Sequence, residues 1–346
     1  MLTLPGFVDL HVHFREPGFE HKEDIASGSL AAARGGYTDV CCMPNTMPVT
    51  DNSDTVQYVN RRGKAVGLVN LLVVGALSLG QDGRKLADYK GMKDAGICAL
   101  SDDGKTLQNE ELMYEAVIKA KELGVLITDH AEPEVEIVAR DINLAEKTGC
   151  HIHLQHISMK ESVELIRKAK SRGIPITAET APHYFALTSE ALQTHKADAK
   201  MNPPLQKEAD RLAIIEGLKD GTIDAIATDH APHSEAEKAQ PLDKAPFGII
   251  GLETAFAITY TTLVRAGHLT LKQLTDLMSL NPAKIIGINN PSGKVVVDVD
   301  KPYTISRDGF ASKGKNTPFD GVEVYGRIMM TEYNGKITWK DENYDR

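Results

Sequence analysis

The stretch Phe7-Val-Asp-Leu-His-Val-His-Phe14 joins a run of apolar residues to two histidines. The run predicts a buried β-strand over Phe7–Val12. Because side chains two residues apart in a strand lie on the same face, His11 and His13 are expected to point together. Taken alone, such a pair is more often a packing or surface feature than a metal site, so the rest of the chain decides what it means.

Seven further short apolar runs follow, separated by helical stretches rich in alanine and charge. The expected later strands are Thr38–Cys42, Val69–Val74, Ile97–Leu100, Val125–Thr128, His151–Gln155, Ile174–Ala178 and Ile223–Ala227, and the clearest helices are Glu23–Arg34, Glu110–Leu123, Lys160–Arg172 and Arg211–Leu218. Several helices end at a glycine (Gly35, Gly124, Gly173), as helices commonly do. Eight strands alternating with helices predict an α/β fold, a parallel (β/α)8 barrel rather than an open doubly wound sheet.

The pattern changes after the eighth strand. A charged loop with prolines, Ser234–Pro246, precedes expected helices near Glu253–Arg265 and Leu271–Ser279. The tail, Val295–Lys340, has the pattern of short strands and turns. The sequence therefore predicts a barrel domain over residues 1–290, and a C-terminal segment over residues 291–346 that contributes to a small β subdomain.

Composition narrows the classes of protein. The 346 residues are 42% hydrophobic and 25% charged, which is ordinary for a folded globular chain. A formal net charge of -9 argues against a general nucleic-acid binder. There is no apolar run of membrane-spanning length, and the four cysteines show no CxxC spacing. We expect a cytoplasmic protein with no nucleic-acid or membrane partner.

Histidines and acids occur at the ends of five expected strands, where barrels of this kind carry their catalytic groups. They are His11 and His13, Asp102 and Asp103, Asp129 with His130 and Glu132, His153 and His156, and Asp229 with His230 and His233. Each set has a simpler explanation: Asp-Asp-Gly is usually a turn, acids can cap helices, and His151 and His153 can pack around their strand. Their coincidence at one rim favours a metal site, and imidazoles with carboxylates suit zinc.

Five longer motifs contain many of these residues. They are His11-Val-His-Phe-Arg-Glu-Pro-Gly18, Met43-Pro-Asn-Thr46, Lys200-Met-Asn-Pro-Pro-Leu205, Ala227-Thr-Asp-His-Ala-Pro-His233 and Ala245-Pro-Phe-Gly248. Together they resemble the amidohydrolase superfamily and, within it, the bacterial type I dihydroorotases, over nearly the whole chain. The resemblance implies reversible cyclisation of N-carbamoyl-L-aspartate to L-dihydroorotate in de novo pyrimidine biosynthesis.

The resemblance also implies a set of metal ligands for one or two zinc ions per subunit. His11, His13 and Asp229 would hold one ion, His130 and His156 a second, and Asp103 would bridge them. Asp102 remains a rival for the bridge. Other superfamily members use a carboxylated lysine there, but the fourth strand of this chain has no lysine. Asp229 would also act as the catalytic general base.

A second group of residues is expected to bind the substrate. Arg15 can form a bidentate pair with the carboxylate that does not react, although an ion pair with Glu16 or Glu20 is the simpler alternative. By resemblance, Asn45 and His233 would complete this clamp, and Asn202 with the backbone of Phe247 and Gly248 would contact the polar edges of the ring. His230, Glu179 and His183 are expected to support the ligands from behind.

Other interpretations stay open. The chain could be another cyclic amidohydrolase (a dihydropyrimidinase, hydantoinase or allantoinase) or a non-catalytic dihydroorotase-like subunit of aspartate transcarbamoylase. A homodimer is expected, and a transcarbamoylase partner stays open. Compared with the family, this chain is short before Pro5, between Glu132 and Glu134, and near Ser292. Loss of appendage strands predicts a β appendage that is partly missing, with an exposed apolar sheet edge.

Overall fold

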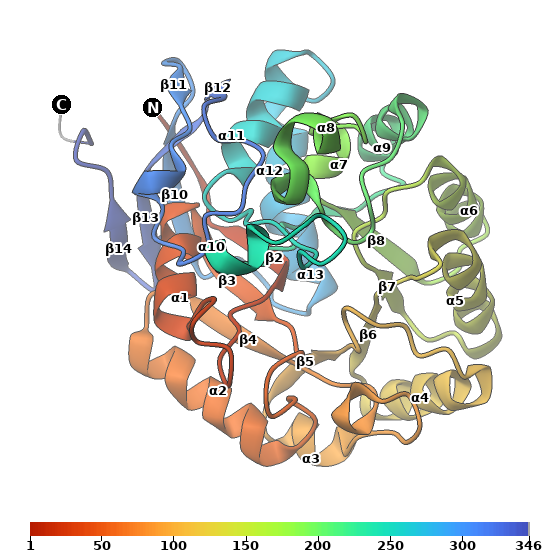
Figure 1. Ribbon diagram of the computed structural model, residues 1–346. Coiled ribbons are helices and arrows are strands. Elements are labelled where there is room, and N and C mark those ends of the chain that lie inside the picture. The colour runs from red at the N-terminus through yellow and green to blue at the C-terminus, as the bar shows by residue number, and fades with distance from the viewer. Residues whose placement is uncertain (345–346) are drawn as a thin grey trace.

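Eight parallel strands form a barrel in the computed structural model, which describes residues 1–344 (Figure 1). In chain and sheet order they are β2 (Phe7–Val12), β3 (Tyr37–Cys42), β4 (Asn70–Gly75), β5 (Ile97–Leu100), β6 (Leu126–Asp129), β7 (Ile152–Leu154), β8 (Ile176–Thr180) and β9 (Ala225–Ile226). The barrel closes where Val12 forms a parallel bridge with His230, just beyond β9. The predicted (β/α)8 barrel is confirmed, although β7 and β9 are shorter than expected.

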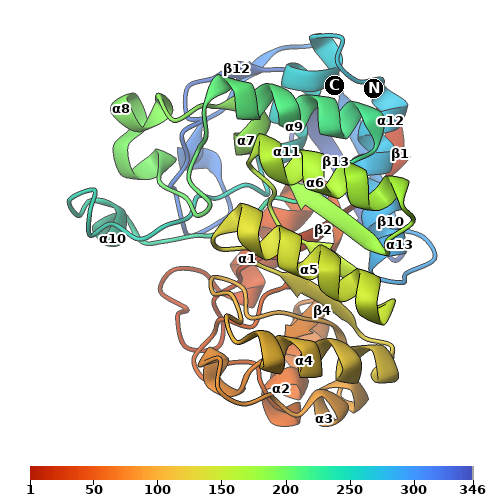
Figure 2. The same ribbon diagram turned by 90° about the vertical axis from the view of Figure 1, so that its right-hand side faces the viewer.

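Helices surround this barrel (Figures 1 and 2). The longer ones are α1 (Ile25–Arg34), α2 (Ser53–Val66), α4 (Glu110–Leu123), α5 (Glu134–Thr148), α6 (Lys160–Ser171) and α9 (Glu208–Asp220). The shorter ones are α3 (Tyr89–Asp94), α7 (Pro182–Ala186), α8 (Ala191–His195), α10 (Glu235–Lys238), α11 (Ala255–Thr259), α12 (Leu271–Thr275) and α13 (Asn281–Ile285). None of the helices within residues 1–344 is both long and apolar enough to cross a membrane.

Three expected helices differ in detail. The helix expected from Glu23 begins at Ile25, because the side chain of Asp24 accepts a hydrogen bond of 2.8 Å from the backbone N–H of Ser27 and caps the helix. The single helices expected near residues 253–265 and 271–279 are each divided. Both α11 and α12 continue into a π-helical turn, at Tyr260–Arg265 and Asp276–Leu280.

A second, antiparallel sheet packs beside the barrel and joins the two ends of the chain (Figure 1). Its order is β1 (Leu2–Pro5), β10 (Gly293–Asp298), β13 (Arg327–Tyr333) and β14 (Lys336–Lys340), and a short pair, β11 (Tyr303–Thr304) with β12 (Glu323–Val324), lies nearby. The β appendage was predicted, but β1 was not. Its edge strands expose apolar side chains, Leu2 by 39% and Ile337 by 58%. The domain boundary at residue 290 stays a prediction, and residues 345–346 of the predicted C-terminal segment lie outside the described residues.

Strand β2 carries an irregularity at His11. Asp9 pairs with Val40 of β3, but the next pairing is Val12 with Cys42, so three steps along β2 match two along β3. This extra residue is a β-bulge, a device that changes the direction of side chains near functional sites. His11 lies inside the bulged segment.

Asp9 forms hydrogen bonds that connect this bulge with Thr228, close to the point where the barrel closes. Its carboxylate is fully buried and accepts hydrogen bonds from the backbone N–H of His11 (3.1 Å), the backbone N–H of Thr228 (3.0 Å) and the hydroxyl of Thr228 (2.6 Å). Burial raises the pKa of this carboxyl to about 7. Asp9 was not among the predicted functional residues, although an acid within a buried apolar strand is itself a signal of a structural role.

We predict that Asp9→Ala lowers the free energy of unfolding by about 2 kcal/mol or more, because it leaves three buried donors without an acceptor. Asp9→Asn keeps an acceptor and should lose less. Urea denaturation followed by circular dichroism measures both. A loss in Asp9→Ala no larger than that in Asp9→Asn would contradict this role.

The comparison of the wild type with Asp9→Asn also predicts how stability depends on pH. The pKa of Asp9 is higher in the folded chain than the ordinary value of 3.8, so folding favours its protonated form. The wild type therefore loses stability relative to Asp9→Asn as the pH rises from 5 through about 7. Denaturation curves at pH 5, 6, 7 and 8 test the direction.

Candidate active site

Four histidines surround one carboxylate at the rim where the barrel strands end. One oxygen of Asp103, Oδ1, lies 3.0 Å from Nε2 of His11, 3.6 Å from Nδ1 of His130 and 3.8 Å from Nε2 of His156. Its other oxygen, Oδ2, lies 3.4 Å from Nε2 of His13. These residues form two groups that could each hold a metal ion, and Asp103 belongs to both. This is the geometry expected of a bridging ligand.

Asp229 completes the first of these groups. Its Oδ1 lies 3.1 Å from Nε2 of His13 and 3.6 Å from Nε2 of His11. The backbone at Asp229 is left-handed, with φ of 48°. Among the described residues, six that are not glycine have positive φ, and three of these are predicted site residues, Arg15, His156 and Asp229. Such strain persists where the surroundings enforce it, and it concentrates at functional sites.

The rival bridge, Asp102, is engaged elsewhere. Both of its carboxylate oxygens accept hydrogen bonds from Ser78, one from the backbone N–H and one from the hydroxyl. The geometry therefore favours Asp103 over Asp102 as the shared ligand.

The hydrogen bonds of His11 test whether this cluster fits a metal. Nδ1 of His11 lies 3.1 Å from Oε1 of Glu179, so the ring proton belongs on Nδ1. Nε2 then carries a lone pair, and this buried atom has no hydrogen-bond partner in the described part of the chain, although Asp103 is close. A nitrogen lone pair facing carboxylate oxygens is unfavourable unless a cation lies between them. The donor set fits a metal ion.

The pKa shifts within the cluster also favour a bound cation. Burial raises the pKa of a carboxyl, but the neighbouring histidines hold the pKa values of Asp103 and Asp229 well below the ordinary range. Conversely, burial lowers the pKa of a histidine, yet Asp103 is the main group that raises that of His11, and hydrogen bonds to Asp103 and Glu132 raise that of His130 to about 9. A cluster that draws positive charge so strongly is suited to a cation.

Asn45 holds His13 in a matching orientation. Its Oδ1 lies 2.9 Å from Nδ1 of His13, so Nε2 of that ring faces the two aspartates. The amide nitrogen of Asn45 donates to Oδ2 of Asp103 over 3.3 Å. A residue predicted to bind substrate thus also positions two members of the metal cluster.

One cavity of about 180 Å³ contains nearly all of the predicted side chains. It is lined by His13, Arg15, Asn45, Asp103, Gly104, His130, His156, Asn202, Asp229, Ala231, His233, Phe247 and Gly248. His11 is the one predicted site residue outside this list, and it is fully buried beside Asp103. The structure therefore brings the predicted ligands and the predicted substrate-binding residues to one place.

Arg15 makes no ion pair among the described residues. Its Nε donates to the carbonyl of Pro232 over 3.3 Å, and Nη2 lies 3.4 Å from Nε2 of His233. The acids that were its alternative partners are engaged elsewhere: Glu16 pairs with Arg62 at 2.7 Å, and Glu20 accepts from the backbone of Gly18. An uncompensated guanidinium in the cavity wall is a binding group for an anion.

Two residues that the sequence analysis missed hold the loop containing Phe247 and Gly248. The ammonium group of Lys238 donates to the carbonyls of Gly248 (2.8 Å) and Pro246 (3.1 Å). The side chain of Asn316 donates to the same Gly248 carbonyl (3.1 Å) and accepts from the backbone N–H of His233 (3.1 Å). Asn316 reaches the loop from the tail, 68 residues away, whereas Lys238 lies only ten residues before Gly248.

The three residues expected to support the metal ligands make different contacts. Glu179 contacts His11, as described above. His230 instead faces Glu23, 3.4 Å away, and Nε2 of His183 is buried with no hydrogen-bond partner in residues 1–344.

Asn202, a predicted substrate-binding residue, donates to Oε2 of Glu132 over 2.9 Å and lies 3.3 Å from His130.

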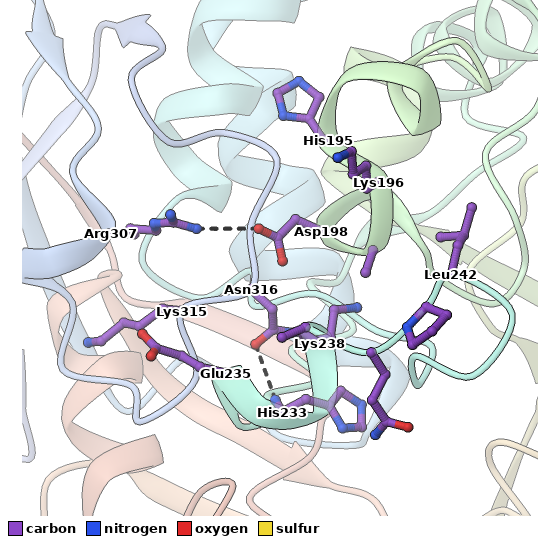
Figure 3. Close-up of a pocket in the computed structure, with 14 residues that line it drawn as sticks. His195, Lys196, Asp198, His233, Glu235, Lys238, Leu242, Arg307, Lys315 and Asn316 are labelled. Carbon is purple, nitrogen blue, oxygen red and sulfur yellow. Dashed lines mark hydrogen bonds and ion pairs between the residues drawn. The ribbon is translucent and has the colours of Figure 1, made fainter.

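A larger cavity of about 750 Å³ lies next to the site, between α8, α10 and the tail (Figure 3). Figure 3 shows Arg307 paired with Asp198, 3.3 Å apart, and Asn316 bonded to His233. Of the predicted site residues it contains His233 alone. Its size does not make it the catalytic site, because neither of the two metal-binding groups lines it.

Comparisons with known proteins agree with this geometry. A family model described as dihydro-orotase-like matches residues 1–136. The dihydroorotase of Desulforapulum autotrophicum is 44% identical over 99% of this chain and 88% of its own length. That of Geobacillus sp. (strain WCH70) is 45% identical over 98% of this chain and 87% of its own length. The matched spans, 375 residues in both cases, exceed the 346 residues of this chain, so these relatives carry internal segments that it lacks.

Solved structures share the architecture. The L-hydantoinase (dihydropyrimidinase) of Arthrobacter aurescens superposes with a TM-score of 0.88 at 24% identity, covering 97% of this chain and 85% of that one. A D-hydantoinase gives 0.83 at 21% identity, covering 98% and 85%. At such identities the likeness establishes the fold alone. The near full-length identity to the two dihydroorotases goes further: this chain belongs to the dihydroorotase family.

Proposed function

We propose that this chain is a zinc-dependent dihydroorotase, which interconverts N-carbamoyl-L-aspartate and L-dihydroorotate. One observation carries the proposal. The Arg15 guanidinium, which has no ion pair among the described residues, lies in the same cavity as members of both groups that could hold a metal ion. A substrate with one reacting carbonyl and one free carboxylate needs both features. Zinc is the proposed ion because imidazole nitrogens and carboxylate oxygens are its usual ligands.

We assign the ligands as the sequence predicted them. His11, His13 and Asp229 would hold one zinc ion, and His130 and His156 a second, with Asp103 between them. Bound zinc would activate water at neutral pH and polarise the carbonyl of the substrate. The remaining steps belong to side chains of this protein.

Asp229 is proposed to move the proton. In hydrolysis of the ring, its carboxylate would accept the proton of the attacking water and deliver it to the ring nitrogen as the carbon–nitrogen bond breaks. In cyclisation it would take the proton from the carbamoyl nitrogen as that nitrogen attacks the side-chain carboxyl, which then loses one oxygen as water. Cyclisation consumes a proton overall, so acid favours dihydroorotate and alkali favours the open form.

Arg15 is proposed to bind the carboxylate that does not react. Asn45 and His233 lie beside it in the cavity wall and would complete the clamp. Asn202 and the backbone of Phe247 and Gly248 would contact the polar edges of the ring. The clamp favours dihydroorotate over hydantoins and simple dihydropyrimidines, which offer Arg15 no carboxylate.

The alternative of a non-catalytic subunit is less well supported, because every expected ligand type is in place. The homodimer, a transcarbamoylase partner and a cytoplasmic location stay predictions.

The proposed activity is tested by a substrate panel on purified protein of measured metal content. We expect hydrolysis of dihydroorotate, followed by its ultraviolet absorbance, in a preparation that contains one or two zinc ions per chain. Removal of zinc with a chelator should abolish turnover, and added zinc should restore it. Turnover of hydantoin or allantoin without turnover of dihydroorotate would overturn the assignment.

We predict that Arg15→Met raises the KM for dihydroorotate about 30-fold or more, since loss of one partner of a desolvated charge pair costs about 2 kcal/mol or more. Zinc content should stay normal. Arg307→Met is the matched control, because Arg307 lines the neighbouring cavity rather than this one. An unchanged KM in Arg15→Met would exclude the carboxylate clamp.

We predict that Asp229→Asn lowers kcat by about 100-fold or more in both directions, because an amide cannot accept the proton. The assay is run with saturating zinc and bound zinc is measured in parallel, which separates proton transfer from metal loss. Substantial turnover by zinc-loaded Asp229→Asn would rule out the proton-transfer role.

A further inference from the structure

A line of hydrogen-bonded side chains runs from the metal cluster down through the barrel. Nδ1 of His11 lies 3.1 Å from Oε1 of Glu179, whose Oε2 lies 3.1 Å from Nε2 of His153. Nδ1 of His153 lies 2.9 Å from the hydroxyl of Thr177, and this hydroxyl lies 2.8 Å from Nε2 of His151. His11, Glu179 and His153 are buried, whereas Thr177 and His151 are half-buried.

Below His11, which lies in β2, the line follows the neighbouring strands β7 and β8, whose places in the barrel are seen in Figure 1. His153 of β7 is the direct partner of Thr177 of β8. His151 precedes His153 by two residues, and Glu179 follows Thr177 by two, so each pair shares a face of its strand. The line therefore descends from the rim, where parallel strands end, toward the opposite end of the barrel, where they begin. There His151 lines a separate cavity of about 310 Å³.

The hydrogens of this line can be placed by elimination. The carboxylate of Glu179 only accepts, so both His11 and His153 must donate to it. Hydrogen bonds from His11 and His153 outweigh burial and hold the pKa of Glu179 at about 2. Because Nε2 of His153 donates to Glu179, Nδ1 is the ring atom left to accept from the hydroxyl of Thr177. That hydroxyl then accepts from Nε2 of His151, so each hydrogen bond in the line has one donor and one acceptor.

This order of donors and acceptors fixes the tautomer of His11, at the end of the line that faces Asp103. A proton held on Nδ1 of His11 leaves the lone pair of that ring on Nε2, the atom that faces Asp103. If Thr177 no longer donates, Nδ1 of His153 becomes an acceptor without a donor, and the ring is held by Glu179 alone. A ring that turns away from Glu179 no longer holds that carboxylate against His11, so the proton on Nδ1 of His11 loses the acceptor that fixes its place.

We propose that His153 and Thr177 are positioning residues which act through Glu179 to fix the tautomer and orientation of His11 for metal binding. The proposal rests on the assignment of His11 as a ligand in the proposed function. It gives roles to two residues that touch neither substrate nor metal. Groups that orient a ligand in this way typically contribute about 10- to 100-fold to metal affinity.

The test uses the whole chain and zinc alone as the probe. Thr177→Val removes the hydroxyl at nearly constant shape, and Thr177→Ser restores it. Thr128→Val is the matched control: Thr128 of β6 pairs with His153, and no hydrogen bond of its hydroxyl is found in residues 1–344. Zinc affinity is measured by competition with a chromophoric chelator, and the ring tautomers of His11 and His153 are read from long-range ¹H–¹⁵N spectra.

We expect Thr177→Val to weaken zinc binding about tenfold and His153→Phe at least as much, with Thr177→Ser and Thr128→Val within about twofold of the wild type. The spectra should show the Nε2–H form of His153 and the Nδ1–H form of His11 in the wild type, and a mixture of tautomers at His11 in Thr177→Val. Equal zinc affinities in Thr177→Val and Thr128→Val, or an unchanged affinity in His153→Phe if Thr177→Val does not fold, would overturn the proposal. None of these measurements requires turnover of dihydroorotate, so failure of the proposed activity would be seen separately.

Discussion

One buried carboxylate organises this rim of the barrel. Asp103 lies within 4 Å of four histidine rings that come from three different strand ends. Such a group of donors is unfavourable in the folded chain unless a cation joins it, because lone pairs and negative charge would face one another in a region of low dielectric. The strands, bulge and loops around it are therefore best understood as the structure that holds these donors together.

The backbone around the cluster departs from regular geometry at the residues that carry chemistry. His11 lies inside the bulge in β2, and left-handed backbone occurs at Arg15, His156 and Asp229. Each such residue costs roughly 1 kcal/mol or more, which must be offset by contacts elsewhere. The buried Asp9 is one such contact, since two hydrogen bonds from Thr228 join it to the segment just after β9, and a third, from the backbone N–H of His11, lies within the bulged strand itself.

Much of the fold could be predicted from local periodicity, whereas the ligand set and most substrate-binding residues came from motifs that resemble a known family. Apolar runs alternating with helical stretches predict the barrel, and polar residues at strand ends are brought to one rim by any parallel barrel. What the sequence could not predict depends on contacts between distant segments. Asn316 reaches the loop at Gly248 from the tail, and β1 is a strand because β10, nearly the whole chain away, pairs with it. The roles of His153 and Thr177 likewise require knowing which strands are neighbours.

The same barrel occurs in an L-hydantoinase and a D-hydantoinase, so the fold alone does not choose the substrate. The choice must come from groups that do not bind metal. Here Arg15 follows the second histidine of β2 by two residues, close enough to share the cavity and far enough to leave the metal donors undisturbed. Glu16 and Glu20, its acidic neighbours in the sequence, are engaged by other partners. In the proposed function an anionic substrate satisfies the charge of Arg15 and a neutral ring does not, so the proposal assigns to this arginine, rather than to the metal donors, the separation of dihydroorotate from its uncharged analogues.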